Sequence, residues 1–517
     1  MKLARSSGVL LHPTSLPTTP GIGTLGSEAY RFVDWLSDAG QTLWQILPLG
    51  PTGYGDSPYA SFSTFAGNPL LVDLDILVAQ GYLTQDDVIP PDYIKDSGPV
   101  DFGSVVWWKT PILKKAAKKF LESADTRDFN DFLRRNASWL DDFALFMDIK
   151  EFHDAQAQEQ GLQGKLWNNF WPKELATRDA KALREWARSR GAFLDSHKAI
   201  QFFFFSQWAA LKKYANDKGI SIIGDVPIFV AADSADVWSN QRLFQLNRDG
   251  TPKAVAGVPP DYFSATGQLW GNPLYDWHAM KKDGYAWWVA RIRHILDLVD
   301  YIRVDHFRGF EAYWAIPAGE PTAINGRWVK GPDHDFFRTI RKKLGDLPIL
   351  AEDLGLITDE VKRLRDDFSL PGMKVLQFAF DVSEAGKEGF TNPFLPHMYG
   401  ENSVVYTGTH DNDTMRGWID NASPAEISLV HDYLGGKTAQ EDIVGELVRV
   451  SLMSVAVFAI FPLQDIYGLG SETRMNTPST LGNNWTWRMD RALLENSRAA
   501  WLKKLSRLYA RNIRHLS

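Results

Sequence analysis

Short apolar runs alternate with amphipathic helices along most of this 517-residue chain, and this alternation constrains the fold more than any other feature. Each run ends in polar or charged residues, and a helix-like pattern follows. The eight runs span residues 7–11, 42–47, 220–224, 301–310, 348–355, 374–380, 403–407 and 455–461. Strands that alternate with helices form parallel sheets, and eight of them are most economically arranged as a (β/α)8 TIM barrel of the α/β class. A doubly wound open sheet is the alternative, but no Gly-rich dinucleotide motif follows the first run.

Two stretches depart from this alternation. Residues 70–194 are mostly helical in pattern, which predicts a helical insertion between the second and third strands. Residues 231–275, after the third strand, form a loop-rich excursion with many aromatic residues, typical of a binding loop. We therefore expect three parts: residues 1–69 as the first part of the barrel, 70–194 as a helical insertion subdomain, and 195–517 as the remainder of the barrel.

Composition and charge exclude several classes of protein. The formal net charge of −7 argues against an electrostatic nucleic-acid binder. The absence of cysteine excludes disulfides and thiol catalysis, and a reducing cytoplasm is the natural setting. The N-terminus lacks the apolar core of a signal peptide, and the longest apolar run, near residues 455–463, is too short to span a bilayer. We expect a soluble, cytoplasmic protein, a monomer or weak homo-oligomer, with no nucleic-acid or membrane partner.

Carboxylates follow the predicted strands at the end where barrel enzymes carry their catalytic groups. They are Asp225, Asp305, Glu352, Asp381 and Asp411, with Arg303 and His410 close by in sequence. A single aspartate at a strand end is often only the N-cap of the next helix. Five acids on one rim would repel each other when ionised, which stability alone would not select. We therefore interpret this rim as a candidate active site.

Such an acidic rim is compatible with two kinds of chemistry. Carboxylates that share divalent metals would indicate two-metal phosphoryl transfer. The run His410-Asp411-Asn412-Asp413 resembles a metal loop, yet it lacks the glycine and terminal glutamate of an EF-hand. A pair of carboxylates with different pKa values would instead indicate glycoside chemistry. The sequence contains no P-loop, HExxH or GxSxG motif.

Asp305 and Glu352 differ in the way that a retaining glycosidase requires. Arg303 shares a strand face with Asp305, so it should lower the pKa of that carboxyl and keep it charged as a nucleophile. The competing interpretation of this pair is a fold-stabilising ion pair. Glu352 has Leu350 on its face and no basic neighbour nearby in sequence, so its pKa should rise and it could donate a proton. The two carboxyls would lie about 5 Å apart, with Asp411 as the stabiliser of the transition state.

The motifs around these residues are specific. They are Gly224-Asp225-Val226-Pro227-Ile228, Arg303-Val304-Asp305-His306-Phe307-Arg308-Gly309, Ala351-Glu352-Asp353-Leu354-Gly355, Thr409-His410-Asp411-Asn412-Asp413-Thr414, Leu11-His12-Pro13-Thr14-Ser15-Leu16 and Arg474-Met475-Asn476-Thr477-Pro478. Through them the chain resembles the 4-alpha-glucanotransferases (amylomaltases, or disproportionating enzymes) of the α-amylase clan over essentially its full length. The resemblance implies that Asp305 is the nucleophile, Glu352 the acid/base and Asp411 the transition-state stabiliser.

The same resemblance implies a set of substrate-binding residues. Those that would line the donor subsite next to the cleaved bond are Tyr59, Asp225, Arg303 and His410. Those that would cover acceptor subsites are Gln268 and Trp270. Further residues expected to contact the glucan are Asp56, Ser57, Asp381 and Asn476. Tyr54 is either a second glucan contact outside the active site or an ordinary loop tyrosine.

The implied activity is transfer of an α-1,4-glucan segment to the 4-hydroxyl of another glucan or of glucose, through a covalent glucosyl-enzyme. α-1,4-Glucans and malto-oligosaccharides would serve as donor and acceptor, without a metal or cofactor. The aromatic loops over the rim are consistent with a sheltered acceptor site, but hydrolysis by an enzyme of the same clan stays open. A glucan-binding protein without turnover is a further alternative, against which the intact acids argue.

Overall fold

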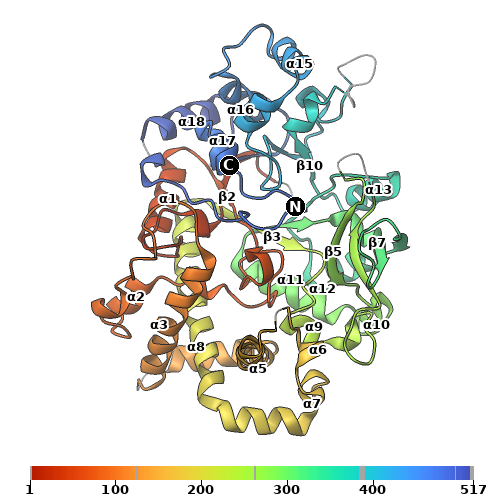
Figure 1. Cartoon of the computed structure of the whole chain (residues 1–517). Helices are drawn as coiled ribbons and strands as arrows, with labels where there is room; N and C mark the ends of the chain where they lie inside the picture. Colours follow the sequence, from red (N-terminus) through yellow and green to blue (C-terminus); the bar gives the residue numbers. More distant parts are fainter. Residues whose placement is uncertain are drawn as a thin grey trace.

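A closed barrel of eight parallel strands forms the centre of the computed structural model, which describes residues 3–123, 126–162, 164–260, 264–382, 391–494 and 496–512 (Figure 1). The strands follow one another around the barrel in the order β1-β12-β11-β10-β9-β6-β3-β2. They are β1 (Ser6–Leu10), β2 (Leu43–Gln45), β3 (Ser221–Pro227), β6 (Tyr301–Asp305), β9 (Ile349–Ala351), β10 (Gly372–Val375), β11 (Ser403–Tyr406) and β12 (Phe458–Pro462). The predicted (β/α)8 barrel is therefore confirmed, together with a helical insertion between β2 and β3.

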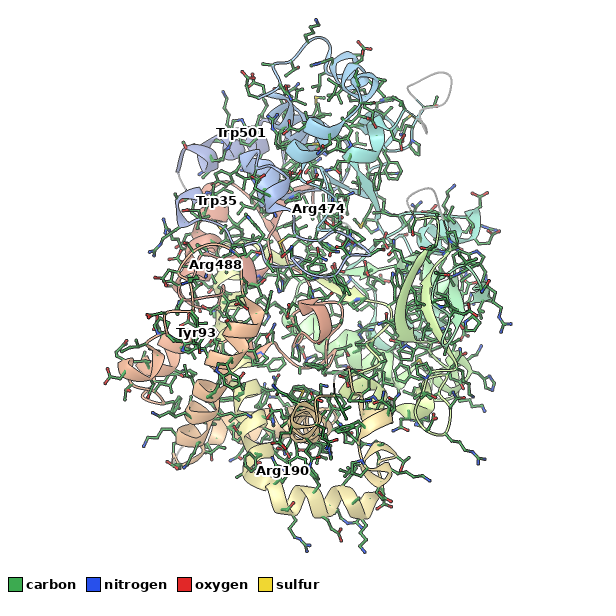
Figure 2. All side chains as sticks on the ribbon, in the orientation of Figure 1. Trp35, Tyr93, Arg190, Arg474, Arg488 and Trp501 are labelled. Atoms are coloured by element: carbon green, nitrogen blue, oxygen red, sulfur yellow. The ribbon has the colours of Figure 1, made fainter. Side chains whose placement is uncertain are left out.

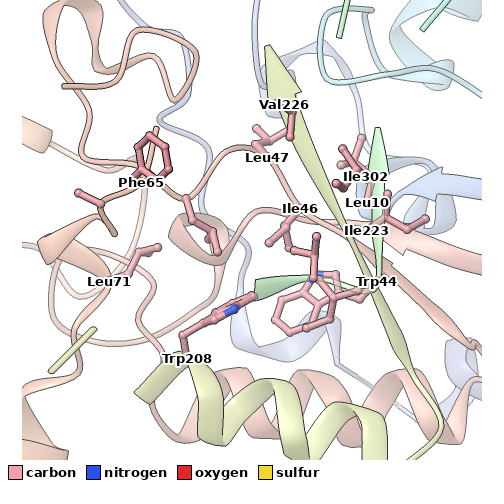
Figure 3. Packing of buried hydrophobic residues seen from close by; sticks show 14 of the residues in the cluster. Leu10, Trp44, Ile46, Leu47, Phe65, Leu71, Trp208, Ile223, Val226 and Ile302 are labelled. Atoms are coloured by element: carbon pink, nitrogen blue, oxygen red, sulfur yellow. The ribbon is translucent and has the colours of Figure 1, made fainter. Parts of the chain in front are cut away.

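The strands of the barrel pack against many buried apolar side chains. Every residue of β11 and β12 is buried, as parallel strands covered by helices require. Figure 3 shows Trp44 of β2 and Trp208 of helix α8 among the buried side chains around the strands. Each indole N–H donates to a main-chain carbonyl, Trp44 to Leu11 at 2.8 Å and Trp208 to Leu298 at 2.9 Å. The tryptophans therefore fill the core without leaving their polar atom unpaired.

Helices cover the outside of the barrel. The helices outside the insertion are α1 (Ser27–Asp38), α9 (Ala235–Ser239), α10 (Trp277–Lys282), α11 (Ala286–Leu298), α12 (Asp333–Leu344), α13 (Asp359–Asp367), α14 (Met415–Asn421), α15 (Pro424–Leu434), α16 (Ile443–Met453), α17 (Leu463–Tyr467) and α18 (Asn496–Leu508), and several of them pack on the barrel. Within the part of the chain that the structure describes, no helix has the length and apolar character needed to cross a membrane.

The insertion, drawn in orange and yellow in Figure 1, packs around one long helix. Its helices are α2 (Leu74–Ala79), α3 (Phe102–Leu121), α4 (Arg127–Asn136), α5 (Leu140–Glu159), α6 (Trp167–Phe170), α7 (Lys173–Ala176) and α8 (Ala180–Asp217). Helix α8 packs against α3 and α5 and continues to β3 of the barrel. Its only irregular residue is Arg190, with φ −124° and ψ 20°. Because α8 runs across residue 194, it belongs to both regions, and the limits of the three expected parts stay a prediction.

The sixth apolar run, predicted as a strand over residues 374–380, is a strand only at its start. β10 ends at Val375, and Leu376–Phe380 forms a 3-10 helix. Leu376, Ala379 and Phe380 are buried in a second, smaller hydrophobic cluster with residues of α14, α15 and α16. A continuous apolar run is buried in either conformation, so its pattern did not distinguish the strand from the turn that follows.

A four-stranded antiparallel sheet beside the barrel was not predicted. Its order is β5-β4-β7-β8, from β5 (Gln268–Pro273), β4 (Ala254–Val258), β7 (Ala312–Pro317) and β8 (Arg327–Lys330). The excursion at 231–275 supplies β4 and β5, and the chain after β6 supplies β7 and β8. Residues 261–263 of the excursion lie outside the described residues. The sheet explains how an excursion this rich in turn residues is held in one place over the barrel.

Candidate active site

Strand register brings the predicted carboxylates to one end of the barrel. Asp225 in β3 is paired with Arg303 in β6, so the two side chains leave neighbouring strands at the same level. β6 and β9 pair up to the residues just before Asp305 and Glu352, so these two acids follow side by side. Neighbouring strands lie about 4.8 Å apart. This spacing suits the carboxyl separation of a retaining glycosidase.

Arg303 is the centre of a buried charge cluster. Its guanidinium lies 2.5 Å from Asp225 Oδ2 and 3.1 Å from Asp305 Oδ1. The hydroxyl of Tyr59 donates to the same Asp225 oxygen at 2.7 Å. The side chains of Arg303 and Asp225 are 3% and 0% exposed, whereas that of Asp305 is 28% exposed. Asp305 is therefore the member of this cluster that is open to a reacting atom.

The pKa of Asp305 is raised, so the predicted lowering by Arg303 is wrong in its net sign. Burial raises the pKa of Asp305 to about 6, because it outweighs the opposite effect of Arg303. Burial and the charge of Asp305 raise the pKa of Glu352 further, to about 8. The predicted rise for Glu352 is confirmed. Asp305 still ionises first, so between these values one carboxyl is charged while the other holds a proton.

The main chain after β6 fixes the orientation of Glu352. His306 adopts a left-handed conformation with φ 55° and ψ 48°, and its N–H donates to Glu352 Oε2 at 2.7 Å. The N–H of Leu354 donates to Oε1 at 3.0 Å. Both carboxyl oxygens are therefore held by rigid backbone donors directly beside Asp305, as a pre-organised acid/base requires.

Asp411 is held by contacts of its own. His410 Nε2 lies 3.3 Å from Asp411 Oδ2, and Asn476 Nδ2 donates to Oδ1 at 2.6 Å. Burial opposes the charge of Asp411, but the charge of His410 and the hydrogen bonds from His410 and Asn476 outweigh it and lower the pKa of Asp411 to about 2. Asp411 in turn outweighs burial and raises the pKa of His410. A carboxylate that stays charged suits the stabilisation of a cationic transition state.

A wall of aromatic rings lies between the charge cluster around Arg303 and the contacts of Asp411. The rings of Tyr59 and His410 stack with centroids 5.1 Å apart and an interplanar angle of 19°. Trp485 packs on both, with centroid distances of 5.7 Å to Tyr59 and 5.8 Å to His410. Flat ring faces of this kind suit the apolar faces of sugar rings. The predicted donor-side residues Tyr59, Asp225, Arg303 and His410 are thus brought together.

Gln268 and Trp270 approach the same end of the barrel from β5. The Trp270 indole meets the His306 ring edge to face at 4.8 Å and donates to Gln268 Oε1 at 3.1 Å. The Trp270 side chain is 38% exposed. The antiparallel sheet therefore carries an aromatic side chain to the residue next to Asp305, on the side where Glu352 lies.

The other predicted binding residues are less closely connected to the three acids. Asp56 and Ser57 lie at the end of the 3-10 helix Tyr54–Asp56, where Ser57 Oγ accepts the N–H of Tyr59 at 3.2 Å. Asp381 is half-buried after the 3-10 helix that follows β10, and not directly at a strand end. The side chain of Tyr54 lies outside the described residues. Contacts of these residues with substrate stay predictions, as do the roles of the three acids.

His306, Trp485 and Arg474 belong to the site but were not predicted. Arg474 Nη2 donates to the main-chain oxygen of Asp411 at 2.7 Å. His306 and Arg474 stand inside the quoted motifs, so their sequence position was a usable signal. Trp485 is distant in sequence from both Tyr59 and His410, and no local pattern could have indicated this contact.

The charge between the carboxylates is supplied by a protein side chain. Arg303 stands between Asp225 and Asp305, at a position that a bridging cation would otherwise occupy. Among the described residues, no group of three or more His, Cys, Asp or Glu side chains could hold a metal ion. A side chain of the protein thus supplies the positive charge that pairs with Asp225 and Asp305.

Comparisons with known proteins agree with this geometry. Residues 11–494 match the family model described as 4-alpha-glucanotransferase. The chain is 50% identical to the 4-alpha-glucanotransferase of Thermus thermophilus in an alignment of 498 residues that covers 95% of each chain. It is 48% identical to the 4-alpha-glucanotransferase of Synechocystis sp. in an alignment of 522 residues that covers 99% of each chain. It superposes on the amylomaltase of Streptococcus agalactiae, solved in complex with acarbose, with a TM-score of 0.92 and 42% identity, over 98% of this chain and 99% of the other.

Proposed function

Because the chain belongs to the 4-alpha-glucanotransferase family, we propose that Asp305, Glu352 and Asp411 divide between them a retaining transfer of α-1,4-glucan segments. The protein is a 4-alpha-glucanotransferase, of the type EC 2.4.1.25. The observation that carries the division of roles is the placement of the two carboxyls at the ends of neighbouring strands, with Arg303 against Asp305 and two main-chain N–H groups against Glu352. Asp305 is charged in a range where Glu352 still holds a proton.

In the first step, the Asp305 carboxylate attacks the anomeric carbon of the donor glucan and forms a covalent glucosyl ester. The bond between that carbon and the glycosidic oxygen breaks, and Glu352 gives its proton to the departing oxygen. The negative charge moves from Asp305 to Glu352 in this step, and the ester no longer exerts the repulsion that raised the pKa of Glu352. Asp411, which stays ionised, stabilises the positive charge that develops on the sugar ring.

In the second step, the 4-hydroxyl of an acceptor glucan or of glucose attacks the same carbon. Glu352, now a carboxylate, takes the hydroxyl proton, and the ester bond to Asp305 breaks. The two displacements together retain the configuration at the anomeric carbon. The position of Trp270 against His306 supports an acceptor site beside Glu352, where a bound sugar excludes water.

The family implies α-glucans as substrates, and we propose malto-oligosaccharides as both donors and acceptors. The wall of Tyr59, His410 and Trp485 supports binding of sugar rings on the donor side. A monomer or weak homo-oligomer in the cytoplasm remains our expectation from the sequence.

Incubation of the enzyme with maltotriose tests the proposal. Transfer produces glucose together with a ladder of longer oligomers. Hydrolysis produces only glucose and maltose, and that result would exclude the transferase activity. A loss of activity on treatment with EDTA would restore the metal hypothesis that Arg303 argues against.

A further inference from the structure

The loop that carries Asp411 is fastened by residues from a distant part of the chain. Thr407, at the start of this loop, donates to Asp465 Oδ2 at 2.5 Å, and the N–H of Met415, at its end, donates to Asp465 Oδ1 at 2.7 Å. Between these ends, Ser471 Oγ donates to Asp413 Oδ2 at 2.7 Å. The segment 465–471 therefore fixes the base and one flank of the loop, but these contacts do not reach Asp411.

The side chain of Asp411 is more exposed than that of Asp305. Its side chain is 46% exposed, compared with 28% for Asp305. A partly exposed carboxylate on a loop can rotate away from the reacting carbon unless other groups hold it. Asn476 and His410 hold its two oxygens, so its orientation depends on where the Asn476 side chain itself is held.

Arg474 binds the main chain of both partners in this contact. Its Nη2 donates to the carbonyl oxygen of Asp411 at 2.7 Å, and its Nε donates to the carbonyl oxygen of Asn476 at 2.7 Å. The side chains of Asp411 and Asn476 are joined to each other at 2.6 Å. The three residues thus form a closed ring of hydrogen bonds, in which one guanidinium sets the distance between two backbones.

We propose that Arg474 is a positioning residue that holds Asp411 and Asn476 in the geometry that transition-state stabilisation requires. The planar guanidinium offers two parallel N–H groups with a fixed spacing, which suits two carbonyl oxygens at once. A lysine would reach one carbonyl as a point charge and would leave the other free to move. This role rests on the proposed function of Asp411, and in it Arg474 acts through the main chain of Asp411 and Asn476.

Arg488 provides a matched control within the same chain. It is a buried arginine that also donates only to main-chain oxygens, those of Gly98, Thr18 and Lys95, at 3.1 to 3.3 Å. Figure 2 labels both arginines at separate places in the molecule. Arg474→Met and Arg488→Met therefore remove the same type of interaction, but only the first removes it from the loop of Asp411.

The experiment compares kcat and KM for maltotriose in Arg474→Met, Arg474→Lys, Asn476→Ala and the double variant Arg474→Met/Asn476→Ala. We expect Arg474→Met to lower kcat about 10- to 100-fold, as a small misplacement of a catalytic group does, with KM changed less than about twofold. Arg474→Lys recovers less than half of this loss on a logarithmic scale. The double variant loses no more than its worse single variant, because both changes release the same carboxylate.

An activated donor, α-maltotriosyl fluoride, separates this role from an effect on proton transfer. The deficit of Arg474→Met persists with the fluoride, because the charge on the sugar ring develops with any leaving group. Arg488→Met lowers the melting temperature but leaves kcat within threefold. The proposal is wrong if Arg474→Met keeps kcat within threefold of wild type, or if its loss and that of Asn476→Ala multiply. If Arg474→Met does not fold, the same criteria apply to Arg474→Lys. A fully active Asp411→Asn variant would instead refute the proposed function itself.

Discussion

Two buried arginines at opposite ends of the barrel are surrounded by different kinds of partner group. At the mouth, Arg303 is paired with the carboxylates of Asp225 and Asp305. Burial opposes its charge, but these acids outweigh burial and raise the pKa of Arg303. At the base, Arg511 is 0% exposed, and burial lowers its pKa to about 9. Its guanidinium is surrounded by main-chain carbonyl oxygens, including that of Ala456 at 2.8 Å.

The difference follows from what each end of the barrel has to do. Arg511 joins the start of β1 at Ser6 to the chain between α16 and β12, and so ties the C-terminal segment to the closing strands. Carbonyl dipoles satisfy its N–H groups without adding a charge that could titrate near neutral pH. At the mouth, the positive charge of Arg303 is balanced by carboxylates. Carboxyl groups can change their protonation during a reaction. Changes at the mouth should therefore alter rate, and changes at the base should alter stability.

The largest effect is expected for Asp305→Asn. The amide cannot attack the anomeric carbon, so kcat for maltotriose should fall by at least about 10⁴-fold. Arg303 keeps its contact with Asp225, so the melting temperature should stay within about 2 °C of wild type. Activity assays and thermal unfolding of the same preparation test both statements. Near-normal turnover would remove Asp305 as the nucleophile, and an unfolded variant would remove the contrast with the base.

Glu352→Gln should lower transfer from maltotriose about 10²- to 10⁴-fold, because the glycosidic oxygen leaves without a proton. With α-maltotriosyl fluoride the first step needs no acid, so fluoride should appear in a rapid burst of about one equivalent per active site. Turnover after the burst stays slow because the acceptor hydroxyl lacks its base. Azide, a nucleophile that needs no base, should restore turnover with the fluoride. Equal losses with both donors, and no burst, would contradict the acid/base role.

Much of the active site at the barrel mouth could be predicted because the sequence patterns that indicate it are local or periodic. The alternation of apolar runs with helices indicated the barrel, and the barrel indicated that acids after successive strands meet at one rim. The antiparallel sheet was missed because β4 pairs with β7, which comes after β6 and shows no helix- or strand-specific period of its own. The pKa of Asp305 was misjudged because burial is set by the assembled mouth, not by the arginine two residues away. The contact of Asn476 with Asp411 joins residues 65 positions apart, which no local pattern can indicate.

Arg511→Met, a change at the base of the barrel, should lower the stability of the protein without changing its catalytic rate. The loss of Arg511 removes the donor to the buried Ser454 carbonyl oxygen and one of the two arginine donors, the other being Arg5, to the carbonyl oxygens of Leu452 and Ala456. We expect the free energy of unfolding to fall by about 3 to 5 kcal/mol, with kcat at 25 °C within twofold of wild type. Urea unfolding and maltotriose assays measure the two quantities. Lys213→Ala, which removes an exposed ion pair with Asp217, is the control and should change neither. A lower kcat with unchanged stability would overturn the assignment of the base.

A graded effect is expected from pH on the wild-type enzyme. Asp305 must be ionised to attack, and burial raises its pKa to about 6, so kcat/KM should fall about tenfold for each unit of pH below that value. Glu352 must be protonated, and burial with the charge of Asp305 raises its pKa to about 8, so kcat/KM should fall likewise above it. A profile flat from pH 4 to 9 would contradict the division of roles.

The same two groups should act on stability with the opposite sign on the acid side. In the unfolded chain both carboxyls ionise near pH 4. The folded state keeps their protons to higher pH, so their contribution to stability is fully present below pH 4 and is lost as pH rises through about 6 and about 8. Wild type should lose the stabilising contribution of Glu352 as pH rises from 6 to about 8. In Glu352→Gln this loss should be absent, so the unfolding free energy should differ less between pH 6 and pH 9. Arg511→Met should leave that difference unchanged between pH 6 and 8, because the folded-state pKa of Arg511 is about 9 and the group stays charged below it. At the mouth, the ionisation of Asp305 and Glu352 that catalysis requires would then lower the stability of the folded protein.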